Sequence, residues 1–240
     1  MEANLGTLPR KKGEAPSVLS LPMLWPKKKS HIEALIEQGE NQHLDFKFAV
    51  NDSRKIARSM VAFANSEGGT LLIGVKDNGA IAGVRTEEEL HMVETAASLY
   101  TRPEVKFQSV PWNLGGKKIL EVKVMPGIQK PYLAPDEKGR WMAWVRNNDR
   151  NILAPTVLIE FWRKQMEGQK VVIEMGIPEK LLLRLFETQG LVSIEEFSQL
   201  IGISRREASR IIIDFMLLGI AECRFEEDKP FFCRKPGAPL

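Results

Sequence analysis

The sequence predicts an α+β protein in two parts: a mixed sheet with flanking helices, then a winged helix-turn-helix. Between residues 31 and 168, apolar patterns typical of strands alternate with patterns of helical spacing. After residue 177, three short helical patterns precede two strand patterns, which is the element order of a winged helix. We therefore expect an arm at 1–30, a first domain at 31–168, a linker at 169–176 and a second domain at 177–240.

Length and composition exclude several classes of protein. The chain has 240 residues, enough for one to two domains. Two cysteines are too few for a disulfide-rich secreted scaffold, and no apolar run approaches the roughly 20 residues of a membrane-spanning helix. The apolar stretch near the N-terminus is followed by Lys27, Lys28 and Lys29, unlike a signal peptide. We expect a cytoplasmic protein without membrane contact.

The net charge of +3 is unevenly distributed. Residues 1–30 carry six basic and two acidic side chains, a net charge of +4, whereas residues 31–170 carry +1 and residues 171–240 carry −2. With prolines at positions 9, 16, 22 and 26, residues 1–30 resemble a flexible basic arm. A solvated leader without a role explains the same composition.

The first half of the first domain contains two helix and two strand patterns. A helix at 31–37 ends at Gly39, and the strand at 44–48 alternates so that one face is expected to be buried and the other exposed. Asn51, Asp52 and Ser53 are candidate caps for the next helix. The near-continuous apolar run 70–75 predicts a strand buried on both faces, followed by a turn at residues 77–79.

The second half of this domain is expected to be rich in hairpins. A capping box, Thr86 with Glu89, predicts a helix through residue 99. Strand patterns at 105–112 and 117–125 flank Gly115-Gly116 and predict a hairpin, and a similar pattern recurs between residues 132 and 146. A helix opened by Pro155 would end near residue 166 and close the domain.

The second domain has the pattern of a winged helix. Helices are predicted at 178–188, 194–201 and 205–218, with Ser193 as the cap of the second. Strands at 220–225 and 230–233 would pair across the acidic turn of residues 226–228. The Gly202-Ile203-Ser204 turn between two short amphipathic helices is typical of a helix-turn-helix.

Few motifs for catalysis are present. The sequence has no Walker motif for nucleoside triphosphates and no zinc-protease or nucleophile-elbow motif. Glu40, Asp45 and Asp77 would, if they converge, bind Mg²⁺ or Mn²⁺ through oxygen, with Lys47 nearby to stabilise phosphate charge. Such a set suits phosphodiester hydrolysis. A hairpin turn at Asp77 and an exposed Asp45–Lys47 ion pair are the structural alternative.

Several segments resemble one known family. These are Gly39-Glu40, Leu44-Asp45-Phe46-Lys47, the run from Ala62-Phe63-Ala64-Asn65 to Gly68-Gly69-Thr70, its continuation to Asp77-Asn78-Gly79, and Ile81-Ala82-Gly83-Val84. Lys130-Pro131-Tyr132 and Trp144-Val145-Arg146 extend the likeness. Over about residues 31–165 the chain resembles the Schlafen AlbA-type domain, which implies a Schlafen/AlbA-like mixed sheet with flanking helices.

The resemblance implies two different activities. In bacteria such domains are usually described as DNA-binding and are often joined to a winged helix in transcriptional regulators. Animal Schlafen relatives include endoribonucleases that cut tRNA and rRNA with three acidic residues, which by motif correspond to Glu40, Asp45 and Asp77. Asp45 stands where that strand more usually has Glu, and the sequence has neither a cysteine/histidine cluster for their zinc finger nor a second copy of the domain.

Three groups of basic residues are candidates for binding nucleic acid. Arg54, Lys55 and Arg58 share one helix face and suit phosphate contacts. Arg146 and Arg150 flank an asparagine-rich loop, whereas the third group lies on the candidate recognition helix. The residues of the third group are Arg205, Arg206 and Arg210. Three consecutive acids in the wing turn oppose phosphate binding there and favour dimerisation or protein binding instead.

The sequence therefore supports three hypotheses. The first is a nucleic-acid-binding transcriptional regulator, contacting DNA rather than RNA, requiring no cofactor and forming a homodimer that reads two half-sites. The second is an endoribonuclease that uses Mg²⁺ or Mn²⁺ with Glu40, Asp45, Lys47 and Asp77. The third is a protein–protein adaptor that dimerises through its winged helix.

Overall fold

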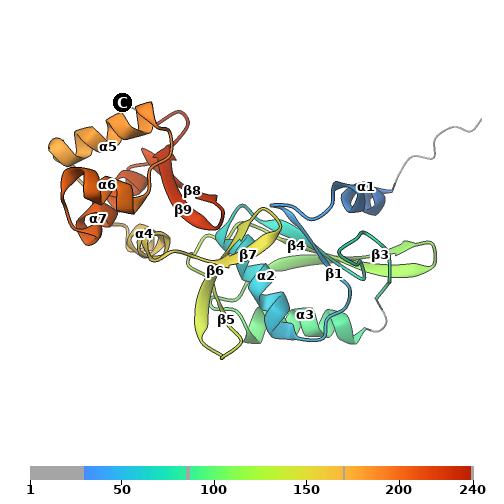
Figure 1. Cartoon of the computed structure of the whole chain (residues 1–240). Coiled ribbons are helices and arrows are strands. Elements are labelled where there is room, and N and C mark those ends of the chain that lie inside the picture. The colour runs from blue at the N-terminus through green and yellow to red at the C-terminus, as the bar shows by residue number, and fades with distance from the viewer. Residues whose placement is uncertain (1–29, 85–86, 170, 239–240) are drawn as a thin grey trace, which may run out of the picture.

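The computed structural model describes residues 30–84, 87–169 and 171–238, and it forms two lobes (Figure 1). The first lobe is built on a four-stranded sheet in the order β1-β2-β4-β3, in which only β1 and β2 run parallel. Its elements are α1 (His31–Gln38), β1 (Leu44–Lys47), α2 (Ser53–Asn65), β2 (Gly69–Ile73), α3 (Glu88–Leu99), β3 (Phe107–Leu114) and β4 (Lys117–Val124).

A second sheet and four helices follow. The sheet is an antiparallel meander, β5-β6-β7, and it lies in the first lobe beside α2 (Figure 1). Three further helices and a two-stranded sheet come after α4 in the order that the sequence predicts. These elements are β5 (Leu133–Pro135), β6 (Trp141–Asn147), β7 (Arg150–Leu153), α4 (Thr156–Met166), α5 (Ile177–Thr188), α6 (Ile194–Ile201), α7 (Arg205–Leu217), β8 (Ala221–Glu226) and β9 (Lys229–Arg234). The α+β class is confirmed.

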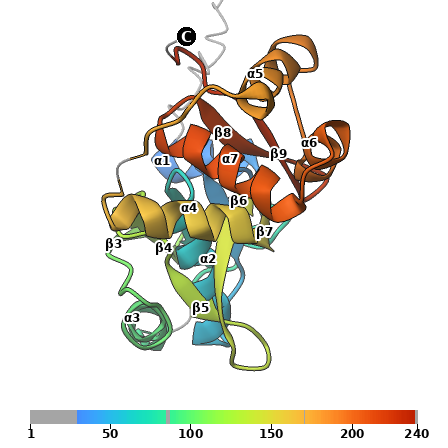
Figure 2. The ribbon, with the colours of Figure 1, turned by 90° about the vertical axis from the view of Figure 1, so that its left-hand side faces the viewer.

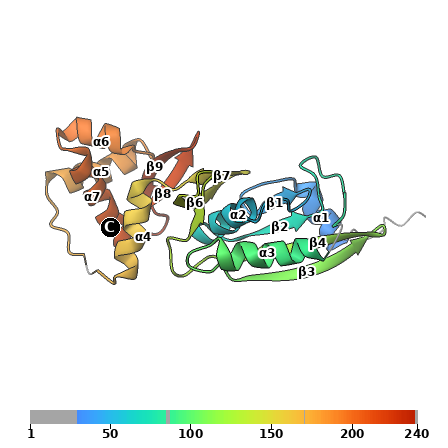
Figure 3. The same cartoon turned by 90° about the horizontal axis from the view of Figure 1, so that it is seen from below.

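Helix α2 organises the first lobe. It connects the parallel strands β1 and β2, as a crossover connection requires. Asp52 caps its first turn by accepting a hydrogen bond from the Arg54 amide. With α3 it covers one face of the four-stranded sheet (Figure 3), and α1 packs on the other face through Ile32. The opposite side of α2 contacts β5 and β6, so the helix lies between the two sheets.

The outer side of the second sheet packs on the C-terminal elements. Ala143 and Val145 of β6 share an apolar core with Trp162 of α4 and with residues of α5, α6 and α7. Helix α4 lies alongside α7 (Figure 2). Ile173, within the linker that the sequence predicts at residues 169–176, packs against this core. The division into domains at that point stays a prediction.

Two details differ from expectation. The predicted half-buried strand at 44–48 is wrong: Asp45 is only 3% exposed and Phe48 is 42% exposed. The reason is that α1 and α2 cover both faces of β1 while Phe48 lies beyond its end. Helix α3 begins at Glu88, and no side chain caps it. The predicted cap Thr86 lies outside the described residues, and so does the basic arm apart from Ser30.

Within the described ranges, no helix has the length and apolarity needed to cross a membrane.

Candidate nucleic-acid interface

Asp45 lies at the centre of a buried polar network between β1 and α2. Lys47 Nζ lies 2.8 Å from Asp45 Oδ1, and the Ser59 hydroxyl donates to Oδ2 at 2.9 Å. Arg146 Nη1 approaches Oδ1 at 3.6 Å. Burial alone raises the pKa of the Asp45 carboxyl, but the charges of Lys47 and Arg146 outweigh it and hold this pKa below its usual value. Asp45 is therefore an ionised, paired carboxylate.

Arg146 is a structural residue of the same network. It is 2% exposed, and its guanidinium donates to the carbonyls of Asn41 and Leu44 and to Asn151 Oδ1 at 3.0–3.2 Å. The face of β6 that carries Arg146 is covered by α2, and the opposite face of the strand is covered by the C-terminal core. The expectation that Arg146 contacts nucleic acid is corrected, because no part of its charged group reaches the surface.

The three acidic candidates are only partly brought together. Glu40 lies beside Asp45 and accepts a hydrogen bond from the Phe46 amide at 2.8 Å; burial, and then the neighbouring Asp45, raises its pKa. Asp77 is exposed in the turn that links Val75 to Ile81. Among the residues that the structure describes, which include all three, no group of three Asp, Glu, His or Cys side chains is placed to hold a metal ion.

The donor set therefore does not fit Mg²⁺ or Mn²⁺. A catalytic divalent ion needs several free oxygen ligands, whereas both oxygens of Asp45 are engaged by Lys47 and Ser59. The turn at Asp77 has a structural explanation, since Asn78 Oδ1 accepts from the Ala80 amide and closes it. We derive no metal-dependent step from these residues.

Two of the three basic residues of α2, Arg54 and Arg58, lie over aromatic rings. The Arg54 guanidinium lies 6.0 Å from the centroid of the Tyr100 ring, and that of Arg58 lies 5.6 Å from the Trp144 ring. Arg102, which the sequence analysis missed, stacks on Trp141 at 3.9 Å. Nothing in the sequence spacing links Arg102 to Trp141; the pair forms because the bridge between Arg102 and Leu133 brings this segment onto β5.

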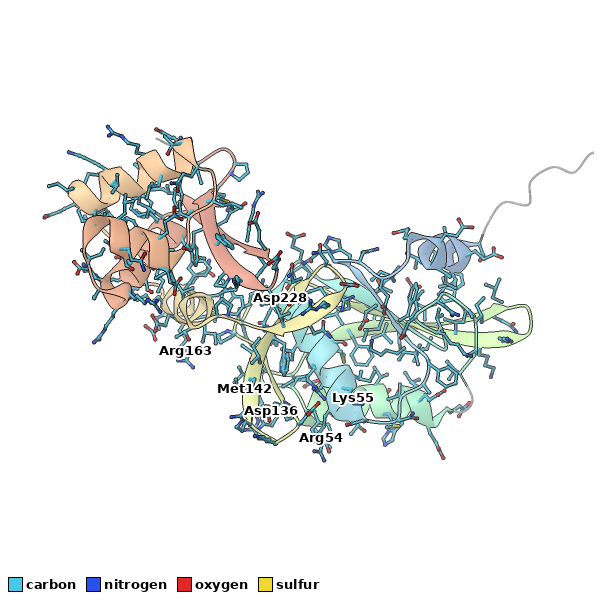
Figure 4. The ribbon with its side chains drawn as sticks, in the orientation of Figure 1. Arg54, Lys55, Asp136, Met142, Arg163 and Asp228 are labelled. Carbon is cyan, nitrogen blue, oxygen red and sulfur yellow. The ribbon has the colours of Figure 1, made fainter. Side chains whose placement is uncertain are left out.

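The Arg54 and Arg58 pairs lie on the side of the first lobe that α2 occupies, and together with Lys55 they form what we call the basic–aromatic surface. The Arg102 pair lies apart from this surface, because Trp141 and Trp144 are three residues apart in β6 and therefore point to opposite faces of the strand. Arg54 and Lys55 are exposed at the same edge of the molecule as the β5–β6 hairpin, marked by Asp136 and Met142 in Figure 4. The surface comprises Arg54, Lys55, Arg58, Tyr100 and Trp144. Stacking holds the arginines in place, and a guanidinium or ammonium presents donors that fit phosphate oxygens.

Arg58 combines a surface and an internal role. Its Nε atom is buried and has no hydrogen-bond partner among the described residues, while its guanidinium covers the Trp144 ring. Substitution of Arg58 would therefore disturb packing as well as charge. Arg54 and Lys55 are exposed, and among the described residues neither has a buried nitrogen without a hydrogen-bond partner.

Arg150 contacts the C-terminal sheet. Its guanidinium forms an ion pair with Asp228, and Asn147 Nδ2 donates to the other oxygen of the same carboxylate at 2.9 Å. Arg150 is 66% exposed. The structure thus brings the tip of the β6–β7 hairpin to the β8–β9 turn, a juxtaposition with no signal in the sequence.

The predicted recognition-helix arginines are exposed at the start of α7. Arg205 lies 3.3 Å from Glu195 of α6. Arg206 and Arg210 have no ion pair within the described residues and line a cleft of about 680 Å³ between α7 and α4, together with Lys164 and Glu160.

Part of the chain is similar to known proteins. Residues 40–155 match the family model described as Schlafen, AlbA_2. The crystal structure of the DIP2311 protein from Corynebacterium diphtheriae is similar, with a TM-score of 0.44 and 14% sequence identity. The match covers 66% of this chain and 39% of the DIP2311 chain.

The second similar structure is an N-terminal domain from Nitrosomonas europaea, solved by solution NMR. It belongs to a protein described as related to the ATP-dependent DNA helicase RecG, and it has a TM-score of 0.37 and 19% identity over 61% of this chain and 97% of the domain. No curated protein matches.

Proposed function

We propose that this protein, whose residues 40–155 match the Schlafen AlbA_2 family, is a nucleic-acid-binding protein that contacts backbone phosphates through its basic–aromatic surface. The observation that carries the proposal is the stacking of Arg54 and Arg58 on aromatic rings. Such arginines are held in one orientation before binding, so little side-chain freedom is lost when a phosphate arrives.

The C-terminal elements support a role in transcriptional regulation. Helices α5, α6 and α7 followed by β8 and β9 have the element order of a winged helix, with α7 as the recognition helix. Arg206 and Arg210 are exposed there and carry charge for DNA contacts. We propose duplex DNA as the ligand, a cytoplasmic location, no cofactor for binding, and a homodimer as the assembly that would read two half-sites.

The endoribonuclease and adaptor hypotheses lack a favouring observation. A nuclease would need its carboxylates free to hold a metal or polarise water, whereas Asp45 is paired with Lys47 and Arg146. An adaptor would not need basic side chains oriented on aromatic rings. Both hypotheses remain distinguishable outcomes of one experiment.

That experiment is an incubation of the full chain with labelled duplex DNA and labelled tRNA, in Mn²⁺ and in EDTA, scored for mobility shift and for cutting. The proposal expects a shift of DNA in both conditions and no cutting. Cutting of tRNA that stops with EDTA would establish the nuclease, and absence of any shift near physiological salt would leave the adaptor.

Paired variants identify the surface. Arg54→Ala with Lys55→Ala removes two exposed charges from α2, and affinity is expected to fall about tenfold near 0.1 M salt because two phosphates are no longer neutralised. Arg163→Ala with Lys180→Ala removes the same two charges from exposed positions on α4 and α5. Figure 4 shows that Arg163 lies well away from Arg54 and Lys55. Equal losses of affinity in both pairs would contradict the assignment of the surface.

A further inference from the structure

We propose that Asn147 and Arg150 form a phosphate-binding site on the β6–β7 hairpin, and that the carboxylate of Asp228 occupies this site until DNA displaces it. The inference rests on the proposed function, because the competing anion is a backbone phosphate. It adds that the C-terminal module suppresses binding by the first lobe. Asp228 lies at the tip of the β8–β9 sheet, directly beside the hairpin (Figure 4).

The geometry of the contact is that of a bound anion. Asn147 Nδ2 donates to Asp228 Oδ1 at 2.9 Å, while the Arg150 guanidinium pairs with Oδ2. Each oxygen of one carboxylate thus receives its own donor from a different side chain. Arginine and asparagine bind phosphate oxygens in the same manner, so the site selects the class of ligand without selecting a base sequence.

The hairpin that carries the site is anchored. At its tip the Asn148 amide donates to Gln42 Oε1 at 2.8 Å, and Gln42 Nε2 donates to the Arg146 carbonyl at 3.0 Å. Arg146 is itself fixed in the buried network around Asp45. The donors therefore keep their positions when the carboxylate leaves, which is the condition for a preformed site.

The turn that carries Asp228 is shaped to deliver it. Glu226 pairs with Lys229, so Glu227 and Asp228 form a two-residue turn, and both have positive φ, 47° and 64°. Glu226 and Glu227 are exposed, whereas Asp228 is partly covered by the hairpin. Of the three acids expected to repel phosphate, only Asp228 makes a contact with the first lobe that the structure records.

The contact is also weak enough to be exchanged. Arg150 is 66% exposed, and exposed ion pairs contribute little to stability. A phosphodiester brings an equivalent negative charge together with the release of condensed counterions, which the carboxylate does not offer. A DNA backbone reaching the hairpin therefore competes effectively for Arg150 and frees the β8–β9 turn.

The test compares two single substitutions in the full chain. Asp228→Asn removes the competing charge, and asparagine accepts the positive φ of this position readily. Glu227→Gln removes the same charge from the adjacent position, which is exposed. Affinity for labelled duplex DNA is measured between 50 and 200 mM salt, and circular dichroism verifies folding.

The inference expects tighter binding by Asp228→Asn than by Glu227→Gln. One additional phosphate contact steepens the slope of log K against log salt by about 0.9, which is about 3.5-fold between these two salt concentrations. Adding Arg150→Gln to Asp228→Asn should abolish the gain. The inference is wrong if Asp228→Asn binds no more tightly than Glu227→Gln, and weaker binding would mean that the contact aligns the two lobes for DNA.

The same data separate this inference from the proposed function. If the wild-type chain binds and Asp228→Asn brings no gain, only the inference fails. If neither the wild-type chain nor Asp228→Asn binds DNA, both fail. Binding by Asp228→Asn alone would support both, because it would show that the contact masks the site in the wild-type chain.

Discussion

Replacement of Arg146 by methionine tests whether this arginine is an internal structural residue. Methionine keeps an unbranched apolar chain of similar length, so the substitution removes the guanidinium with little change in volume. The carbonyls of Asn41 and Leu44 would lose their charged donor, and Asp45 would keep Lys47 as its cationic partner. Arg150→Met is the matched control on the same hairpin.

The cost follows from the interactions of the Arg146 guanidinium. Breaking a buried ion pair by removing one partner costs about 3–5 kcal/mol, and Lys47 retains part of the compensation for Asp45. A buried carbonyl left without its donor adds about 1–3 kcal/mol. We expect Arg146→Met to lower the free energy of unfolding by about 3–5 kcal/mol, whereas Arg150→Met, at an exposed pair, should cost less than about 1 kcal/mol.

Urea unfolding followed by tryptophan fluorescence measures both values, with the slope compared between variants to verify that the extent of unfolding is unchanged. The interpretation would be refuted if Arg146→Met unfolded within about 1 kcal/mol of the wild type. It would also be refuted if the folded variant lost DNA affinity as strongly as a surface-arginine variant.

Three further outcomes are expected. The pKa of Asp45 is lowered in the folded state, so the stability that this carboxylate contributes is complete above its unfolded pKa of 3.8 and is lost as the pH falls through the lower folded pKa. The difference in unfolding free energy between the wild type and Asp45→Asn should therefore shrink in acid. Gly69→Ala should cost about 1–3 kcal/mol in urea unfolding, because its Cβ would lie 2.4 Å from the Phe63 ring. Burial raises the pKa of the Cys223 thiol to about 12 and also raises the pKa of the Cys233 thiol. Both free thiols should therefore react slowly with a disulfide reagent at pH 8 until the chain is unfolded. Rapid reaction of the folded chain would contradict this expectation.

Local signals were sufficient for most of the fold. Gly115-Gly116 predicts a tight hairpin, and β3 and β4 pair across it with Leu114 opposite Lys117. Ser193 predicts the start of α6, and its hydroxyl accepts from the Glu196 amide. Each of these signals acts within a few residues, where turn chemistry and capping decide the structure without reference to the rest of the chain.

The candidate site was less predictable because burial depends on distant segments. Alternation in the strand at 44–48 is typical of one exposed face, yet α2 covers that face and encloses Asp45. Arg146 follows an alternating strand in the same way and is buried because β6 lies between α2 and the C-terminal core. The Asp228 contact joins residues far apart in sequence, so no local pattern could indicate it.

The salt dependence of duplex DNA binding tests the central claim most directly. For the wild-type chain, log K should fall linearly with log salt, and the magnitude of the slope should decrease by about 1.8 when Arg54 and Lys55 are both replaced by alanine, corresponding to two phosphate contacts. The Arg163→Ala, Lys180→Ala chain should keep the wild-type slope. An unchanged slope in the Arg54, Lys55 variant, with its affinity equal to that of the wild type, would contradict the claim that the basic–aromatic surface binds the nucleic-acid backbone.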